Sequence, residues 1–325
     1  MKATRFFCIG VGLFGLILLS VEKNFAAGPK YPTKPIQVIV GFAPGGTDVI
    51  LRPFIDKMPD YLGQPMTFIY KTGATGTLGA GFVVSSKPDG YTVLGGNAAM
   101  LTVTPQVQKV SYSLESFTPI CVLAESYSTL WVLSNARWKN IGELVADAKE
   151  NPGKISFVSP GTLSVQRLLV EAFAREAGIK LNHIPAQGGS SVVTPLLGGH
   201  VDMSVGDVAI GLPHFKAGTV RPLGIFNTKR VRFLPNCPTF AEQGYAVDTS
   251  MGYGLSGPKD MPRDVVEALS LAARKVYENN KASLLDSYDK IGTDIRYLPP
   301  DEFSASLYRE RDFFSKIVKE LDMTK

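Results

Sequence analysis

Histidine, cysteine and tryptophan are scarce in this chain of 325 residues, which contains three histidines, three cysteines and two tryptophans. No histidine lies in an H-E-x-x-H motif and no G-x-S-x-G motif occurs, so the sequence shows neither a zinc-protease helix nor a nucleophile elbow. Carboxylates are scattered, and their spacing alone pairs none of them for acid–base catalysis. These absences predict a protein that is not an enzyme, with no catalytic residue, no metal and no cofactor.

Two cysteines, Cys121 and Cys237, follow the N-terminal segment, and they form no C-x-x-C pair. Neither has a histidine nearby at metal-ligand spacing. They could form a disulfide in an oxidising compartment, or remain as two buried thiols, and the sequence leaves both alternatives open. His183 lies in an apolar strand pattern, where we expect a hydrogen-bonded core residue rather than a catalytic base.

Motifs and charge runs that bind phosphate are also missing. No G-x-x-x-x-G-K-[ST] motif occurs, and no G-x-G-x-x-G opens a helix with an acidic residue about 20 positions further on, although "GATGTLG" loosely resembles such a turn. The formal net charge is +5, and it falls to about +3 without residues 1–27. So mild a charge, with no basic run, predicts no nucleic-acid partner and modestly favours small anionic solutes.

The N-terminus carries the pattern of a secretory signal. Lys2 and Arg5 precede an apolar stretch, Phe6–Val21, and small residues follow at positions 26–28. The stretch is shorter than the roughly 20 residues that a membrane-spanning helix needs. We therefore expect cleavage near Ala27 and an exported, periplasmic protein; a tilted N-terminal anchor is the alternative.

Strand, turn and helix patterns alternate along most of the chain, which predicts an α/β protein with parallel sheets. A first series begins with a strand over Ile36–Phe42 and a helix from about Asp48 to Leu62, and a second series begins near Trp131. Two long helical patterns, Arg263–Asn280 and Pro300–Leu321, follow. Aromatic residues recur along the last one, and we expect them to face the core rather than a cofactor.

Four glycine-rich turns, at 43–48, 73–77, 159–164 and 187–191, each follow an expected strand and precede an expected helix. The start of a helix leaves backbone N–H groups without partners, and the helix dipole adds positive potential there. Glycine lets a ligand approach the backbone, so such turns can hold an anion without lysine or arginine. One such turn often serves only to reverse the chain. Four of them in two series predict a shared crevice at the carboxyl ends of the strands.

Two charged residues near these turns allow two interpretations each. Asp48 can cap free N–H groups at the start of its helix, which is the more ordinary role, or it can orient the turn or a bridging water. Arg167 lies in the first turn of its expected helix, where a cation opposes the dipole. Its guanidinium can clamp a carboxylate, or it can be a solvated surface residue.

Several longer segments occur in the order and spacing of one known family. They include "YPTKPIQVIVGFAPGGTD", "LGQPMTFIYKTGATGTLGA", "KPDGYTVL", "NPGKISFVSPGTLSVQRL", "LLGGHVDMSVGD", "FLPNCPTFAEQGY" and "LSGPKDMPRDVVEAL". From Tyr31 to about Leu321 the chain resembles the tripartite tricarboxylate transporter receptors of bacteria, also called Bug proteins. No single segment is decisive, but their combined order is highly specific.

The resemblance implies an α/β fold of the type II periplasmic-binding-protein kind, with two doubly wound lobes joined by two crossing strands near 125–131 and 223–228. It implies capture of a small organic carboxylate in the cleft between the lobes and delivery to the membrane subunits of a tripartite tricarboxylate-type transporter. A ligand-sensing receptor for a signalling partner and an exported enzyme remain alternatives. The implied segments are a signal peptide at 1–27, a discontinuous first lobe at 28–130 and 225–325, and a second lobe at 131–224.

The family's binding positions transfer to the turns of both lobes, where the ligand carboxylate is held partly through ordered waters. On the first lobe they are Phe42, Ala43, Gly45, Gly46, Thr47, Asp48, Ala74, Thr75, Gly76, Thr77 and Asn97. On the second lobe they are Ser159, Gly161, Thr162, Ser164, Arg167, Ala186, Gln187, Gly188, Gly189 and Asp207.

Three departures from the family pattern suggest a changed ligand. The first turn is one residue shorter than the usual Pro-Gly-Gly-x-x-Asp. Arg167 stands where histidine is frequent, and Ala186 and Gln187 stand where tyrosine and arginine or lysine are common. We expect a bulkier ligand whose distal acid group meets Arg167.

Overall fold

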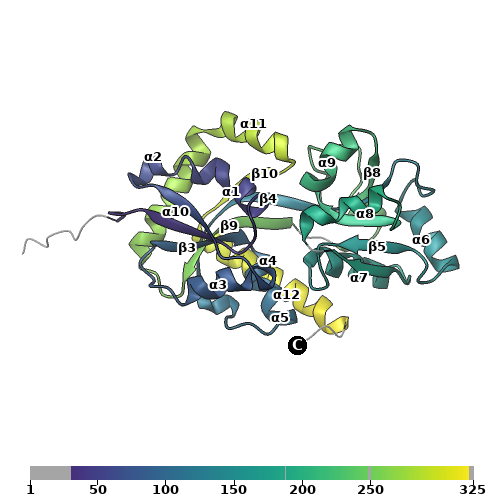
Figure 1. Cartoon of the computed structure of the whole chain (residues 1–325), viewed down its shortest axis with the longest axis horizontal. Coiled ribbons are helices and arrows are strands. Elements are labelled where there is room, and N and C mark those ends of the chain that lie inside the picture. Colours follow the sequence, from purple (N-terminus) through teal and green to yellow (C-terminus); the bar gives the residue numbers. More distant parts are fainter. Residues whose placement is uncertain (1–30, 187, 248–249, 322–325) are drawn as a thin grey trace, which may run out of the picture. The chain divides into compact units, whose positions relative to one another are not determined.

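Alternating strands and helices form an α/β fold around a sheet that contains both parallel and antiparallel strand pairs (Figure 1). The computed structural model describes residues 31–186, 188–247 and 250–321. The expected signal peptide lies outside these residues. Among the described residues the strand order is β2-β1-β3-β9-β4-β7-β5-β6, and β10 and β8 also pair with β4. The strands are β1 (Ile36–Val40), β2 (Met66–Tyr70), β3 (Thr92–Asn97), β4 (Phe117–Leu133), β5 (Ser156–Ser159), β6 (Asn182–Pro185), β7 (Met203–Asp207), β8 (Val220–Ile225), β9 (Ser250–Pro258) and β10 (Asp294–Leu298).

The sheet has two parts that share β4. We call β1, β2, β3, β9 and β10 with the first part of β4 sheet A, and β5, β6, β7 and β8 with the rest of β4 sheet B. The pairs β1–β2, β1–β3, β5–β6 and β5–β7 are parallel, as the alternating patterns predicted. Along β4, Tyr127 pairs with Ser250 of β9, and the next residue, Ser128, pairs with Asp207 of β7. The strand therefore passes from one sheet to the other within the stretch expected to cross, 125–131.

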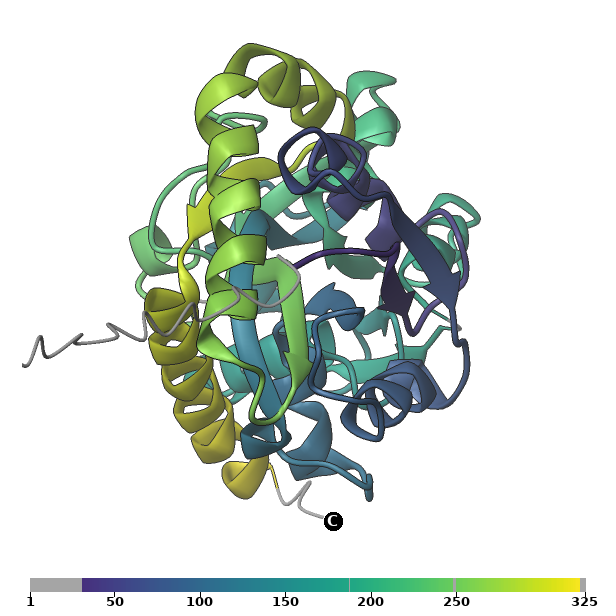
Figure 2. The same ribbon diagram turned by 90° about the vertical axis from the view of Figure 1, so that its left-hand side faces the viewer.

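Both faces of β1 are buried except at Gln37, which explains why this strand is nearly continuous in apolar residues. Because side chains alternate along a strand, Val38 packs in the cluster that contains Leu51 of α1, whereas Ile39 packs with Ala80 of α3. Figure 2 shows the C-terminal helices, in green to yellow, around these strands. The helices are α1 (Thr47–Ile55), α2 (Pro59–Leu62), α3 (Thr77–Val84), α4 (Ala99–Thr102), α5 (Thr104–Val107), α6 (Ile141–Glu150), α7 (Val165–Glu176), α8 (Val193–Leu197), α9 (Val208–Lys216), α10 (Arg263–Asn279), α11 (Lys281–Ile291) and α12 (Pro300–Glu320).

The segment after β8 packs on the side of sheet B before the chain returns to sheet A. The ring of Phe226 stacks on that of Phe240, with 4.0 Å between the ring centroids, and Phe240 contacts Phe173 of α7. The chain re-enters sheet A in β9, which begins at Ser250. The division of the chain into two lobes stays a proposal, and this packing favours placing residues 226–247 in the second lobe.

The two expected C-terminal helices are present as α10 and α12. The sequence patterns did not predict α11 or β10. Cys121 and Cys237 are both free and buried, so the alternative of two buried thiols is the correct one. Among the described residues, none of the helices combines the length and the apolar character that crossing a membrane would require.

Candidate functional site

The first two glycine-rich turns lie against each other at the carboxyl ends of β1 and β2. A Cβ atom on Gly41 would lie only 2.5 Å from the carbonyl oxygen of Gly76, and one on Gly79 would lie 2.8 Å from the Cα of Gly41. Gly76 also has a positive φ of 89°, which side chains rarely adopt. The glycines therefore bring the segment from Phe42 to Asp48 beside the segment from Ala74 to Thr77, which includes Thr75.

Asp48 folds back over its own turn. Its Oδ1 accepts hydrogen bonds from the N–H groups of Gly45, at 2.8 Å, and Gly46, at 3.1 Å. Its Oδ2 accepts from the hydroxyl of Tyr70, at 3.0 Å, and from Arg52, at 3.4 Å. Although burial alone would raise it, these hydrogen bonds together lower the pKa of Asp48 below its ordinary value.

Asp48 therefore has the capping role, which was one of its two expected roles. Its side chain binds N–H groups of the turn that precedes α1 rather than those of the helix itself. Because the N–H groups of Gly45 and Gly46 are bonded to Asp48, a ligand must use other donors of this turn, such as those of Ala43 and Thr47. The hydroxyl of Thr77 is likewise bonded to the carbonyl oxygen of Ala74, at 2.9 Å.

The two turns of sheet B also lie side by side. The N–H of Ala186 donates to the carbonyl oxygen of Ser159, and the N–H of Gly188 donates to that of Pro160, both at 2.8 Å. Gly188 has a positive φ of 104° and leads into the short turn that starts at Gly189. Gln187 lies outside the described residues.

The serine hydroxyls of the Ser159–Ser164 turn are already bonded within the protein. Ser164 Oγ donates to the carbonyl oxygen of Gly161, at 2.9 Å, and accepts from the N–H of Arg167 at 3.3 Å, so it caps α7. Ser159 Oγ donates to Gly161 as well, at 3.0 Å, and lies 2.8 Å from Nε2 of His183. These bonds hold the shape of the turn, and its backbone N–H groups and Thr162 remain as candidates for ligand contact.

The pair of Ser159 and His183 resembles a nucleophile and its base, but its surroundings argue against catalysis. The residue Ser159 is 0% exposed. Burial, with a contribution from the nearby Arg167, lowers the pKa of His183 to about 4. A buried hydroxyl beside so weak a base does not make an activated nucleophile. His183 is hydrogen-bonded, as predicted, but it is only partly buried on the edge strand β6 and is not a core residue.

Arg167 is held over the Ser159–Ser164 turn. Its Nη1 donates to the carbonyl oxygen of Thr162 at 2.8 Å, and its Nε lies 3.4 Å from Oε1 of Glu171. The guanidinium is therefore fixed beside the turn rather than fully solvated. A guanidinium has five N–H donors, so these two contacts leave others for an acid group.

Asn97 and Asp207, which belong to different sheets, are joined through a residue that sequence reasoning missed. Tyr253 of β9 donates its hydroxyl to Oδ2 of Asp207, at 3.4 Å, and Gln166 of α7 donates to Oδ1 at 3.1 Å. Tyr253 lies opposite Asn97 in the β3–β9 pairing. Burial raises the pKa of Asp207 to about 6, and the hydrogen bonds from Gln166 and Tyr253 oppose that rise.

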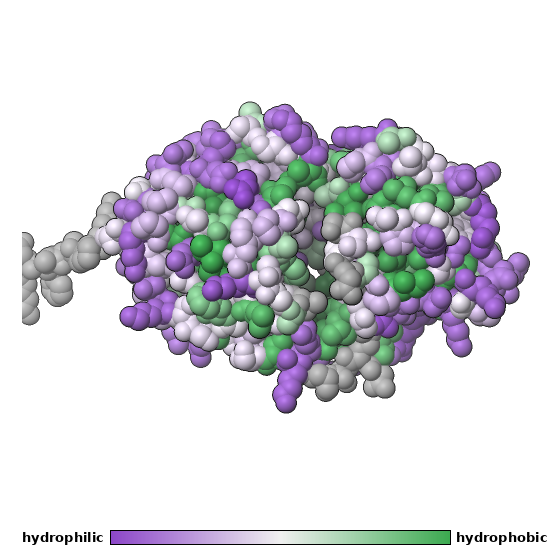
Figure 3. Space-filling model, in the orientation of Figure 1, coloured by the Kyte–Doolittle hydropathy of each residue, from purple (hydrophilic) through white to green (hydrophobic). Residues whose placement is uncertain are grey.

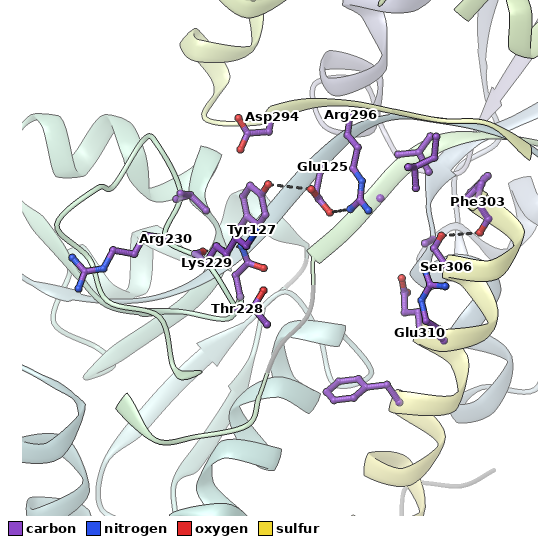
Figure 4. A pocket seen from close by; sticks show the side chains of 18 of the residues that line it. Glu125, Tyr127, Thr228, Lys229, Arg230, Asp294, Arg296, Phe303, Ser306 and Glu310 are labelled. Carbon is purple, nitrogen blue, oxygen red and sulfur yellow. Dashed lines mark hydrogen bonds and ion pairs between the residues drawn. The ribbon is translucent and has the colours of Figure 1, made fainter. Parts of the chain in front are cut away.

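A separate cavity of about 770 Å³ is lined by other residues (Figure 4). Its walls come mainly from β4, β10, α12 and the segment 227–232, with Ala98 and with Gly252 of β9. Among the described residues, none of the expected binding positions lines it. The space-filling view is hollowed between the parts built on sheet A and sheet B (Figure 3).

Comparisons with known proteins agree with this architecture. A family model described as "Tripartite tricarboxylate transporter family receptor" matches residues 50–298. A Cupriavidus necator protein described as "UPF0065 protein in gbd 5'region" is 34% identical over 255 residues, which cover 78% of this chain and 77% of that protein. Protein BugT of Bordetella pertussis is 28% identical over 325 residues, which cover 98% of each chain.

Solved structures are similar over most of the chain. One described as a periplasmic transporter has 31% identity and a TM-score of 0.81, and the match covers 90% of this chain and 99% of that one. The periplasmic binding protein BugD has 26% identity and a TM-score of 0.78, over 91% and 100% of the two chains. Two structures from Rhodopseudomonas palustris are each 23% identical to this chain and match 89% of it. The one with malate has a TM-score of 0.77 and is covered to 100%, and the one with adipate has a TM-score of 0.80 and is covered to 97%. At this identity they support the fold alone.

Proposed function

Because the chain belongs to the family of tripartite tricarboxylate transporter receptors, we propose that it captures a small organic carboxylate between sheet A and sheet B and delivers it to a transporter of that type. The proposal places the ligand at the carboxyl ends of the strands, where the glycine-rich turns lie. The proteins similar to this chain are solute-binding proteins, which agrees with the prediction of a binding protein rather than an enzyme.

The contact of Asp207 with Tyr253, which pairs with Asn97 in the sheet, is the observation that carries the proposal. It places one expected binding residue from each sheet around the same tyrosine, at the point where β4 changes sheets. A ligand bound there touches both parts of the molecule, so binding can favour closure of the two parts around it. We propose that the transporter recognises this closed form.

The chemistry of the turns suits a carboxylate better than a metal or a nucleotide. Backbone N–H groups at a helix start can bind an acid group with charge-assisted hydrogen bonds, which need no counter-ion. Asp48 occupies two N–H groups of the first turn and so reduces the number that a ligand can use. Arg167, beside the Ser159–Ser164 turn of sheet B, adds guanidinium donors. We propose that Arg167 binds a second, distal acid group of the ligand.

Calorimetric titration with malate, adipate, benzoate and nicotinate tests the proposal, since malate and adipate occupy two of the similar structures. At least one acid should bind, and its binding should raise the melting temperature of the protein. Arg167→Ala should weaken the affinity about tenfold, whereas Arg263→Ala, an exposed arginine on α10, should change it less than about twofold. Failure of every acid in a wider panel to bind would contradict the function, and an unchanged affinity in Arg167→Ala would contradict the role of that residue.

Export to the periplasm and the transporter partner are parts of the same proposal. The N-terminal segment supports export, and membership of the family supports the partner. A sensory receptor would use the same binding site with a signalling partner. Uptake of the bound acid by cells with and without the gene for this chain distinguishes the two, because a sensor alone does not change uptake. Recovery of the acid unchanged after incubation excludes the enzyme alternative.

A further inference from the structure

The cavity of about 770 Å³ lies beside β4, and among the described residues none of the expected binding positions lines it (Figure 4). Side chains alternate along a strand, so Glu125 and Tyr127, which flank Ser126 on β4, point to the same side of that strand. Both of these residues line the cavity, whereas Ser126 does not. The volume falls within the range of small-molecule sites. The cavity is thus a space distinct from the proposed carboxylate site.

Residues from both parts of the molecule form its walls. Lys229 belongs to the segment that follows β8, whereas Arg296 lies on β10 and Phe303 and Arg309 lie on α12. In Figure 4, Lys229 lies on one side of the space and Glu310 on the other. A molecule that fills the cavity would contact both walls.

The acidic groups of the cavity are mostly neutralised by partners. Glu125 pairs with Arg296 and accepts from the hydroxyl of Tyr127 at 3.1 Å, and Asp294 pairs with Arg232. Burial raises the pKa of the Glu310 carboxyl to about 7, so near neutral pH it carries only part of a negative charge.

Two cations of the cavity are not compensated. In the described part of the chain, neither the ammonium group of Lys229 nor the guanidinium of Arg309 forms a hydrogen bond or an ion pair. Arg230, by contrast, is bonded to Glu242 through both carboxylate oxygens. The cavity therefore offers two available positive charges, and their long side chains can reach inward from the rim.

Part of the cavity wall is apolar. Val122 of β4, Leu298 of β10 and the phenyl rings of Phe303 and Phe313 on α12 line it. Phe303 and Val122 are buried in the cluster that covers this face of sheet A. A fully hydrated inorganic ion would gain nothing from these groups, whereas an aliphatic or aromatic body would be removed from water against them.

We propose that this cavity is a second binding site, which takes an organic anion with an apolar body and holds its acid group between Lys229 and Arg309. The site is separate from the glycine-rich turns and does not depend on the proposed capture of a carboxylate there. Its ligand class differs as well, because the wall requires an apolar body beside the anionic group. Because its walls come from both parts of the molecule, occupation of this site would influence how far they can move apart.

Fluorescence titration with 1-anilinonaphthalene-8-sulfonate tests the proposal, with N-phenyl-1-naphthylamine as a probe that has the same rings and no sulfonate. The double variant Lys229→Ala/Arg309→Ala should weaken binding of the sulfonate probe about tenfold and leave the neutral probe within about twofold. The control variant Lys216→Ala/Lys275→Ala, which removes two exposed lysines on α9 and α10, should leave both probes unchanged. Lys229→Arg/Arg309→Lys, which keeps both charges, should bind the sulfonate probe within about threefold of the parent.

The outcomes separate this site from the proposed carboxylate site. The proposal is overturned if the sulfonate probe binds Lys229→Ala/Arg309→Ala with the same affinity as the parent. It is also overturned if the control variant loses as much affinity for this probe as the double variant does. If Arg167→Ala weakens the sulfonate probe as much as the double variant does, the probe binds at the turns, and this inference fails while the proposed function stands. If no carboxylate binds but the sulfonate probe requires Lys229 and Arg309, the proposed function fails while this inference stands.

Discussion

The hydroxyl of Tyr70, at the end of β2, lies 3.0 Å from Oδ2 of Asp48 in the first turn of α1. This hydrogen bond ties the first glycine-rich turn to the neighbouring strand. The other carboxylate oxygen of Asp48 holds two N–H groups of its own turn. The shape of this turn therefore depends on an ionised and almost completely buried carboxylate, which is 3% exposed.

Asp48→Asn should destabilise the fold at neutral pH by about 1–2 kcal/mol, because a neutral amide replaces the acceptor of several hydrogen bonds. The pKa of Asp48 is lowered in the folded protein, so its contribution is present above the ordinary pKa of aspartate and is lost as the pH falls through the folded value. Urea denaturation of both proteins at about pH 7 and about pH 3 measures this, and the difference should shrink at the lower pH. Asp56→Asn, at an exposed residue of the same region, is the control. A difference that grows on acidification would contradict the assignment.

Ligand affinity should depend on the protonation of Asp207. Its pKa is raised to about 6, mainly by burial, so it is neutral below that pH and ionised above it. A carboxylate ligand then meets an additional negative charge as the pH rises from about 5 to about 7, and its affinity should fall several-fold. Titration calorimetry at both pH values should show this fall in the parent and not in Asp207→Asn. A similar fall in both proteins would show that another group is responsible.

Glu310→Gln should stabilise the protein at about pH 8 by about 1 kcal/mol. Burial raises the pKa of Glu310 from 4.5 to about 7, so the folded state holds a proton that the unfolded chain has already released. Stability therefore decreases as the pH rises between these two values, and the amide removes the decrease. The hydrogen bond from the Thr102 hydroxyl, at 2.7 Å, can be kept by the amide oxygen. Thermal unfolding at about pH 4 and about pH 8, with the exposed Glu302→Gln as a matched control on α12, measures the effect, and equal stability at the higher pH would contradict it.

Gly41→Ala should destabilise the protein by about 2–3 kcal/mol, because its Cβ would overlap the backbone of Gly76, which cannot rotate away. Gly189→Ala is the comparison, since nothing lies within 4 Å of a Cβ there and its φ is not positive. Chemical denaturation of the two variants should therefore give clearly different free energies of unfolding. If Gly41→Ala is as stable as Gly189→Ala, the two turns of sheet A are not in contact in solution.

The α/β class, the glycine-rich turns and the C-terminal helices could be predicted because each depends on residues that are close in sequence. α11 was missed because Asn280 ends α10 and also begins α11, so the helical pattern shows no clear interruption. The contact between Tyr253 and Asp207 could not be predicted, because it depends on the register of β9 against β3 and β4, and the two residues are 46 positions apart. The sequence allowed two roles for Asp48, and only one of them was the capping of free N–H groups. Which role applies, and that the groups are those of Gly45 and Gly46, could be seen only in the structure.

β4 is a single strand of 17 residues that forms hydrogen bonds in both sheets. A β-strand can twist or bend, but it cannot be stretched without losing its ladder of hydrogen bonds. If one sheet unfolded, β4 would lose its hydrogen-bonding partners in that sheet, and β4 is also part of the other sheet. We expect heat and denaturant to disrupt the two sheets together, as one cooperative event rather than in two successive steps.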